Sequence, residues 1–164
     1  MRHSIHVVVA CCAIAPPMAL AADSPAQEVG REIGAILAWR IGPELVEERC
    51  RAADPGGIEA RERALKTWRD KNAALIVTVD ERLAEIIPLV YPSPDPAKAV
   101  AAVRAQVKEI LLETISAEGD EAKLEAACKE DANPASTRWS SNGVSQVHNS
   151  LAALYDWKMQ TQKK

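Results

Sequence analysis

The sequence predicts an all-α fold: an up-and-down bundle of four main helices with one or two short extra helices and one disulfide. Three observations predict it. Apolar residues recur at helical spacing in every substantial segment, and no strand-like alternation of useful length occurs. Pro and Gly clusters separate these segments by short loops. Amphipathic helices joined by short connections are typical of a bundle.

The first helix is predicted to begin at residues 24–27, where Ser, Pro, Ala and Gln form a capping-box pattern with Pro at the first position. Its apolar stripe runs from Val29 to Leu37. Gly42-Pro43 should break or kink the helix, which leaves a short piece over residues 43–52. The turn at residues 54–57, with the sequence Asp-Pro-Gly-Gly, then separates this piece from the next helix.

A long amphipathic helix is predicted over residues 58–87, because its apolar side chains fall within an arc of about 100°. They are Leu65, Trp68, Leu75, Ile76, Val79, Leu83 and Ile86. Pro88 should end this helix, and the Pro-rich run 92–96 should form a stiff connector. The connector divides the domain into two halves.

The second half is predicted to hold three helices. Asp95-Pro96 caps the first, whose stripe is Val100, Val103, Val107, Ile110 and Leu111. A short helix over residues 121–130 follows, and Asn133-Pro134 ends it. The last helix begins near Gly143, with a stripe formed by Val144, Val147, Leu151, Leu154 and Tyr155.

Residues 1–21 have the pattern of a secretory signal peptide. Arg2 gives a positive start, an apolar run covers residues 7–15, and Ala19-Leu20-Ala21 fits the small-x-small rule for cleavage after Ala21. The apolar run is too short to span a bilayer. We therefore expect a periplasmic or secreted protein in which residues 22–164 form one helical domain with no integral membrane segment. A lipid anchor on Cys11 is the alternative reading of this segment.

Removal of the signal peptide would change the residue counts that matter for chemistry. Of 20 basic and 23 acidic residues, only Arg2 lies in the segment, so 19 basic residues remain and the net charge goes from −3 to −4. This balance, with no basic cluster, excludes a nucleic-acid binder. Cys50 and Cys128 are the cysteines that remain, and an oxidising compartment favours a disulfide between them. Two buried free thiols are the alternative.

The sequence has no motif of a common catalytic or metal site. A phosphate-binding Gly-rich loop, a G-x-S-x-G elbow, a Cys-x-x-Cys pair and a His-Glu-x-x-His motif are all missing. One histidine, His148, remains after the signal peptide, whereas zinc sites take three or four donors. We therefore expect no metal and no cofactor.

Two polar residues interrupt predicted apolar stripes. Asn72 lies near the centre of the stripe of the long helix, and Arg40 is similarly placed at the end of the first helix. Both could serve the structure: Asn72 by bonding a backbone carbonyl, and Arg40 by reaching helix-end carbonyls. Alternatively, they converge on a pocket for a small anionic ligand, which would make the protein a helical-bundle enzyme or carrier.

Trp139 and Trp157 fall outside the predicted stripes, and exposed Trp is enriched at protein interfaces. With no catalytic constellation, these residues favour a protein that recognises another envelope or secreted protein, such as an inhibitor, an immunity protein or an envelope chaperone. A Trp tucked against the bundle is the alternative. Val77 and Leu112 lie opposite their stripes and leave a homodimer open.

Overall fold

The computed structural model describes residues 25–117, 121–131 and 142–163, and all of the regular structure in them is helical. The helices are α1 (Pro25–Ala53), the 3-10 turn η1 (Pro55–Gly57), α2 (Ile58–Val90), α3 (Pro96–Ala117), α4 (Glu121–Asp131) and α5 (Asn142–Thr161). Four long helices, one short helix and a disulfide confirm the predicted all-α class. The predicted signal peptide lies outside the described residues.

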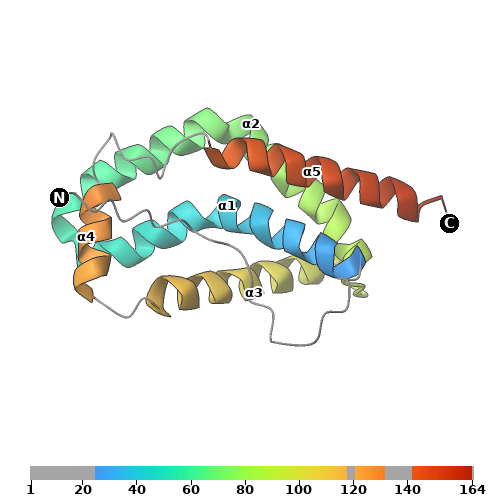
Figure 1. Ribbon diagram of the computed structural model, residues 1–164, viewed down its shortest axis with the longest axis horizontal. Helices are drawn as coiled ribbons and strands as arrows, with labels where there is room; N and C mark the ends of the chain where they lie inside the picture. The colour runs from blue at the N-terminus through green and yellow to red at the C-terminus, as the bar shows by residue number, and fades with distance from the viewer. Residues whose placement is uncertain (1–24, 118–120, 132–141, 164) are drawn as a thin grey trace, which may run out of the picture.

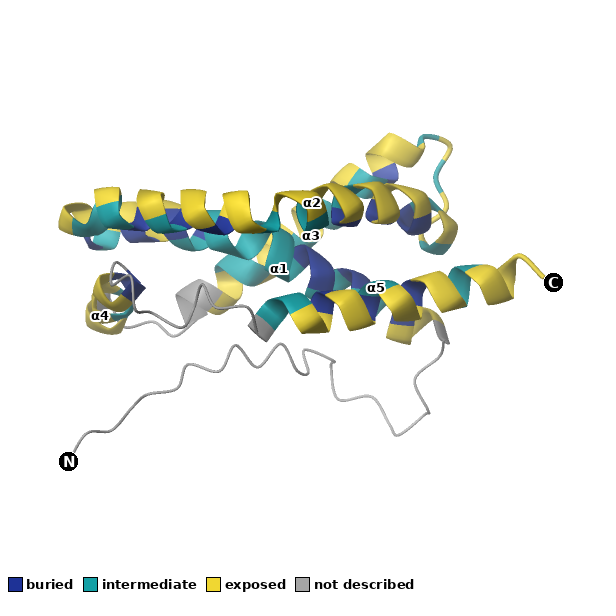
Figure 2. Cartoon of the chain, turned by 90° about the horizontal axis from the view of Figure 1, so that it is seen from above, coloured by how far each residue is buried: buried dark blue, intermediate teal, exposed yellow. Residues whose placement is uncertain are grey.

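The four long helices alternate in direction, as the prediction of an up-and-down bundle requires (Figure 1). Helix α1 packs against α2, α3, α4 and α5 and so forms the centre of the bundle. Seen from above, α2 and α3 lie on one side of α1, and α4 and α5 lie on the other (Figure 2). The C-terminal ends of α2 and α5 are at one end of the molecule, and α4 is at the opposite end (Figure 1).

The core is aliphatic and centres on the contact between α1 and the second half of α2. Ile36, Leu37, Val79, Leu83 and Ile87 are all completely buried. Each such side chain contributes about 1.5–3 kcal/mol through the apolar surface that it removes from water. The predicted stripes of these two helices are therefore the ones that build the core.

Helix α1 continues through Pro43, where the sequence predicted a break or kink. Proline removes one N–H donor, but Leu37 before it and Leu45 after it are both buried against the rest of the bundle. The packing of these flanking residues offsets the lost hydrogen bond. Similarly, α2 runs two residues beyond Pro88, and the Tyr91 N–H bonds the Ile87 carbonyl at its end. The helix therefore ends two residues after Pro88 and before the Pro-rich run 92–96.

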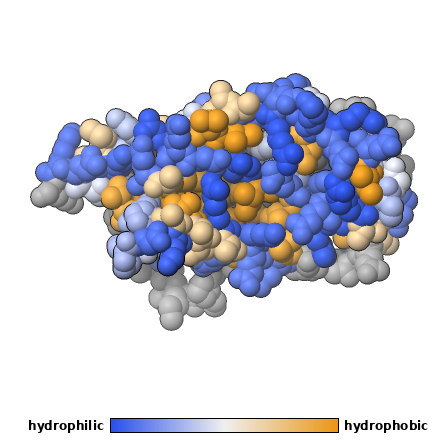
Figure 3. Space-filling model, turned by 180° about the vertical axis from the view of Figure 1, so that it is seen from behind, coloured by the Kyte–Doolittle hydropathy of each residue, from blue (hydrophilic) through white to orange (hydrophobic). Residues whose placement is uncertain are grey.

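Helix α3 begins where predicted, because the Asp95 carboxylate accepts hydrogen bonds from the N–H groups of Ala97 and Lys98. Its apolar stripe, in contrast, is covered only in part. Among the α3 side chains that the structure describes, Ala99 alone is fully buried, and Ile110 is 41% exposed. Apolar side chains also interrupt the otherwise hydrophilic face seen in Figure 3.

Helix α5 is rotated about its axis relative to the face that the sequence predicted. Val147, Ser150 and Leu154 face the bundle, so the buried face lies about 60° from the predicted stripe at 100° per residue. Consequently Tyr155, predicted to be in the core, is 46% exposed. Trp157, predicted to be outside it, is half-buried and packs against the core.

Candidate functional site

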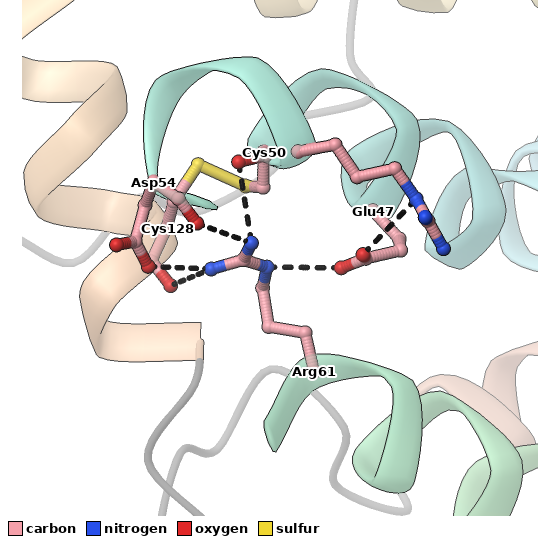
Figure 4. Close-up of a disulfide and its surroundings, with 6 residues drawn as sticks. Glu47, Cys50, Asp54, Arg61 and Cys128 are labelled. Carbon is pink, nitrogen blue, oxygen red and sulfur yellow. Dashed lines mark hydrogen bonds and ion pairs between the residues drawn. A yellow bond between two sulfur atoms is a disulfide. The ribbon is translucent and has the colours of Figure 1, made fainter. Parts of the chain in front are cut away.

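The most completely buried polar residue of the described chain is Arg61, in the first turns of α2 (Figure 4). Its guanidinium donates to Glu47 Oε2 at 2.9 Å and to Asp54 Oδ2 at 2.6 Å. It also donates to three backbone carbonyls: that of Asp54 at 2.7 Å, that of Cys50 at 3.2 Å and that of Cys128 at 3.4 Å. All three nitrogen atoms of the guanidinium therefore donate hydrogen bonds.

The surroundings of Arg61 explain how a full positive charge can be buried there. Two carboxylates, Glu47 and Asp54, oppose it, and their side chains are only 5% and 11% exposed. Cys50 and Cys128 lie in the last turns of α1 and α4, where the helix dipoles favour a cation. Glu47 Oε1 has no hydrogen-bond partner, but Arg51 Nε lies 3.4 Å from it and forms an ion pair.

The Cys50–Cys128 disulfide lies against this cluster and confirms the predicted pairing (Figure 4). Both cysteines are buried, and the bond joins α1 to α4 across 78 positions of the sequence. The sequence interpretation overlooked Arg61, although a signal was present. Arg61 is four residues before Leu65 and seven before Trp68, in phase with the apolar stripe of α2. The criterion that selected Asn72 would have selected Arg61 as well.

Arg40 belongs to a second polar cluster, which joins three helices. The Asp80 carboxylate of α2 accepts a hydrogen bond of 2.6 Å from the Arg104 guanidinium of α3. It also accepts hydrogen bonds of 3.4 Å from the Arg40 guanidinium of α1. Arg40 also lies 3.7 Å from Glu44, which accepts a 2.8 Å hydrogen bond from Arg69. Two guanidinium groups therefore share the one carboxylate of Asp80.

Asn72 has a local partner: its amide donates to the Trp68 carbonyl one turn earlier in α2, at 2.8 Å. This is the structural role that the sequence left open for it. The Trp68 ring packs on Trp39 of α1, with the ring centres 5.1 Å apart. No hydrogen bond or ion pair in the described residues joins Asn72 to Arg40. That both line one ligand pocket stays a prediction.

Residues 44–48 of α1 contribute to the walls of two shallow hollows. One, of about 260 Å³, lies between α1 and α3, with Ile41, Leu45, Arg104 and Lys108 in its walls. Arg104 Nε is buried and has no hydrogen-bond partner. The other, of about 480 Å³, lies between α1 and α2. Neither hollow is lined by Arg40 or Asn72.

Exposed apolar and aromatic side chains occur in or just after the last two turns of α2 and α5. We call four of them the end patch: Leu89, Tyr91, Tyr155 and Met159, which are between 38% and 48% exposed. Lys158 of α5 bonds Glu85 of α2 at 2.8 Å, and the Arg82 guanidinium lies 5.8 Å from the centre of the Tyr155 ring. These two contacts join residues 82–85 of α2 to residues 155–158 of α5.

Trp157 falls between Tyr155 and Met159 in the sequence, but it lies on the opposite side of α5 and is half-buried against the core. Its predicted role in a partner surface stays a prediction. Trp139, the other tryptophan expected at such a surface, lies outside the described residues. His148 is exposed on α5.

Two titratable groups on the surface have shifted pKa values. A hydrogen bond from Lys158, together with its positive charge, lowers the pKa of the Glu85 carboxyl below its ordinary value of 4.5. The hydrogen bond to Glu125 and the charge of that carboxylate raise the pKa of Lys129 above 10.5. Both groups are exposed partners of surface ion pairs, so neither shift indicates a catalytic acid or base.

In the described ranges, no group of three or more His, Cys, Asp or Glu side chains is arranged to hold a metal ion. None of the described helices has the length and apolarity that crossing a membrane requires. No protein-family model matches the chain, and neither does any curated protein or solved structure.

Proposed function

We propose that this protein acts by binding another protein, exported like itself, through the end patch. An inhibitor, an immunity protein or an envelope chaperone would act in this manner. The composition of the end patch is the observation that carries the proposal. Tyr and Met are enriched at protein interfaces, and Tyr is frequent among the residues that dominate binding energy. Here two Tyr and one Met are exposed together with Leu89.

The support comes from position as well as composition. Single exposed apolar residues are ordinary on protein surfaces and need no partner. However, four of the six large apolar side chains exposed in the described chain lie in or just after the last two turns of α2 and α5, two helices that contact each other. The ion pair and the cation–π contact between α2 and α5 hold Tyr155 and its turn of α5 beside α2 before any partner arrives, which lowers the entropy cost of binding.

Site-specific photo-crosslinking tests the proposal. A photoreactive amino acid replaces Met159 or Leu89 in the purified protein, and Val77 gives the matched control. Val77 is 55% exposed and apolar, but it lies about 18 Å along α2 from Leu89 at 1.5 Å per residue. We expect the two patch positions, but not Val77, to give one adduct of defined mass with a protein of the envelope or secreted fraction.

Three outcomes would contradict the proposal: no defined adduct, the same adduct from Val77, or only an adduct with twice the mass of the chain. The last would assign the end patch to a homodimer. Substitution of Trp157 or Trp139 by Ala should lower the adduct yield. Because Trp157 packs against the core, its variant is compared only after circular dichroism shows an unchanged helical content.

A second candidate function is the binding of a small anionic ligand by a helical-bundle enzyme or carrier. The observation that favours it is the arrangement around Asp80, where Arg40 and Arg104 share one carboxylate. Arg104 Nε keeps an unused donor beside the 260 Å³ hollow. Anionic metabolites should then raise the melting temperature, and Arg40→Ala and Arg104→Met should abolish the shift. No shift with any of the anions would exclude this function.

A further inference from the structure

The hollow of about 260 Å³ between α1 and α3 has one acidic and one basic wall. Helix α1 contributes Glu44 and Glu48, one turn apart, and α3 contributes Arg104 and Lys108, also one turn apart. The two helices are in contact and run in the same direction (Figure 1). Lys108 Nζ lies 3.8 Å from Glu48 Oε2, so the two walls approach each other closely. The hollow therefore offers opposite charges on its two sides.

The rest of the lining is aliphatic. Ile41 and Leu45 of α1 and Ala105 of α3 complete it, and Leu45 is buried. At about 30 Å³ for each water in the liquid, the volume corresponds to about nine non-hydrogen atoms, the size of a free leucine or isoleucine. A branched aliphatic side chain placed here would remove apolar surface from water.

The charged groups of the hollow keep hydrogen-bonding capacity for a ligand. The distance between Lys108 and Glu48 is too long for a hydrogen bond, and both side chains are exposed. Arg104 donates through Nη2 to Asp80 at 2.6 Å. Its Nε is buried and has no hydrogen-bond partner in the described chain, which is unfavourable for a charged group. A ligand carboxylate that turns this guanidinium toward the hollow would remove that cost.

We infer that the hollow binds a free α-amino acid with an aliphatic side chain. The α-carboxylate pairs with the two cations of α3, Lys108 above all, because Arg104 is already paired. The α-ammonium pairs with the carboxylates of α1, and Glu48 is its main partner, because Glu44 accepts a hydrogen bond from Arg69. The side chain lies against the aliphatic residues of the lining.

A zwitterion suits this hollow better than a ligand with a single charge. The carboxylates of α1 repel a simple anion, and the cations of α3 repel a simple amine, whereas a zwitterion meets both walls with opposite charge. The inference does not rest on the end patch. It concerns the same hollow as the second candidate function but assigns it a different class of ligand, so the two make opposite predictions for a simple anion.

Titration of the isotope-labelled full chain with L-leucine, followed by the NMR signals of the backbone amides, tests the inference. Signals of residues 41–48 and 104–108 should shift together. The expected Kd is on the order of 1 mM, because the hollow is shallow and solvent screens its charges. Leucinamide lacks the carboxylate, isocaproate lacks the ammonium and glycine lacks the side chain. Each of these analogues should bind at least about tenfold more weakly than leucine.

Two variants, Lys108→Met and Glu48→Gln, remove one charge from each wall. Both should weaken leucine binding about tenfold without a change in helical content. Lys98→Met is the matched control on α3, because its side chain is 84% exposed, pairs with Asp95 at 3.9 Å and does not line the hollow. Its Kd for leucine should equal that of the unmodified chain.

Four results would overturn the inference. Leucine shifts no signal of residues 41–48 or 104–108, or the two wall variants bind it as tightly as the unmodified chain. Lys98→Met loses as much affinity as Lys108→Met, which would show a general effect of charge. Finally, isocaproate binds as tightly as leucine, which would support the anionic ligand of the second candidate function instead. Failure of that function, with no effect of any anion, leaves the binding of leucine as expected here.

Discussion

Removal of the Arg61 guanidinium should be the most destabilising single change near the disulfide. Arg61→Met keeps the length and the apolar stem of the side chain but removes the charge and five hydrogen bonds. The carboxylates of Glu47 and Asp54 then stay in a site where they are at most 11% exposed. Removing one partner of a buried ion pair costs about 3–5 kcal/mol, because the other charge is left uncompensated.

A loss of this size is a large part of the stability of an ordinary domain, which is about 5–15 kcal/mol. For a chain of this length it corresponds to a fall in Tm on the order of 10 °C. Urea unfolding at neutral pH, followed by circular dichroism, measures the free energy directly. Arg63→Met is the matched control in the same helix. The Arg63 side chain is 72% exposed and pairs with Glu59 at 3.6 Å, so its loss should cost less than about 0.5 kcal/mol.

A rescue variant tests the physical reason for the loss. Combining Arg61→Met with Glu47→Gln and Asp54→Asn removes the two stranded charges and should recover part of the stability. The electrostatic reasoning is refuted if Arg61→Met costs no more than Arg63→Met. It is also refuted if the triple variant is no more stable than Arg61→Met alone, because lost packing would then explain the effect.

Two further predictions concern surface charge and close packing. The lowered pKa of Glu85 means that its ion pair with Lys158 contributes stability at neutral pH, which is lost as the pH falls from 4.5 through the folded pKa. Lys158→Met should return the carboxyl pKa, followed by NMR, toward 4.5, and an unchanged value would contradict this. Gly143→Ala should cost about 1–3 kcal/mol, because its Cβ would lie 2.8 Å from Trp39 Cδ1. Gly34→Ala should stabilise α1 by up to about 1 kcal/mol, because the added Cβ meets no atom within 4 Å. The two glycine variants should therefore shift the melting temperature in opposite directions, and shifts of the same sign would contradict this prediction.

The candidate sites were predictable only in part. Cys50 and Cys128 could be paired from the sequence, because two thiols allow one intramolecular bond. Arg40 and Asn72 were detected because each interrupts an apolar stripe. Their partners, Asp80 and the Trp68 carbonyl, were not, because a stripe shows that a polar group is buried but not which group faces it. Arg61 was overlooked although it lies in the same stripe as Asn72.

The sequence by itself determined the helical class, the number of long helices and the buried faces of α1 and α2. Helical periodicity and capping are local properties, and these two helices are covered on the side that the period predicts. Only the tertiary structure decided whether α1 continues through Pro43, how far α3 is covered and which face α5 turns inward. Those outcomes depend on neighbouring helices, whose packing can offset a lost hydrogen bond or rotate a helix by about 60°. The contact of Arg82 with Tyr155 and the Arg61 cluster exist for the same reason: each joins residues that only the packing of separate helices brings together.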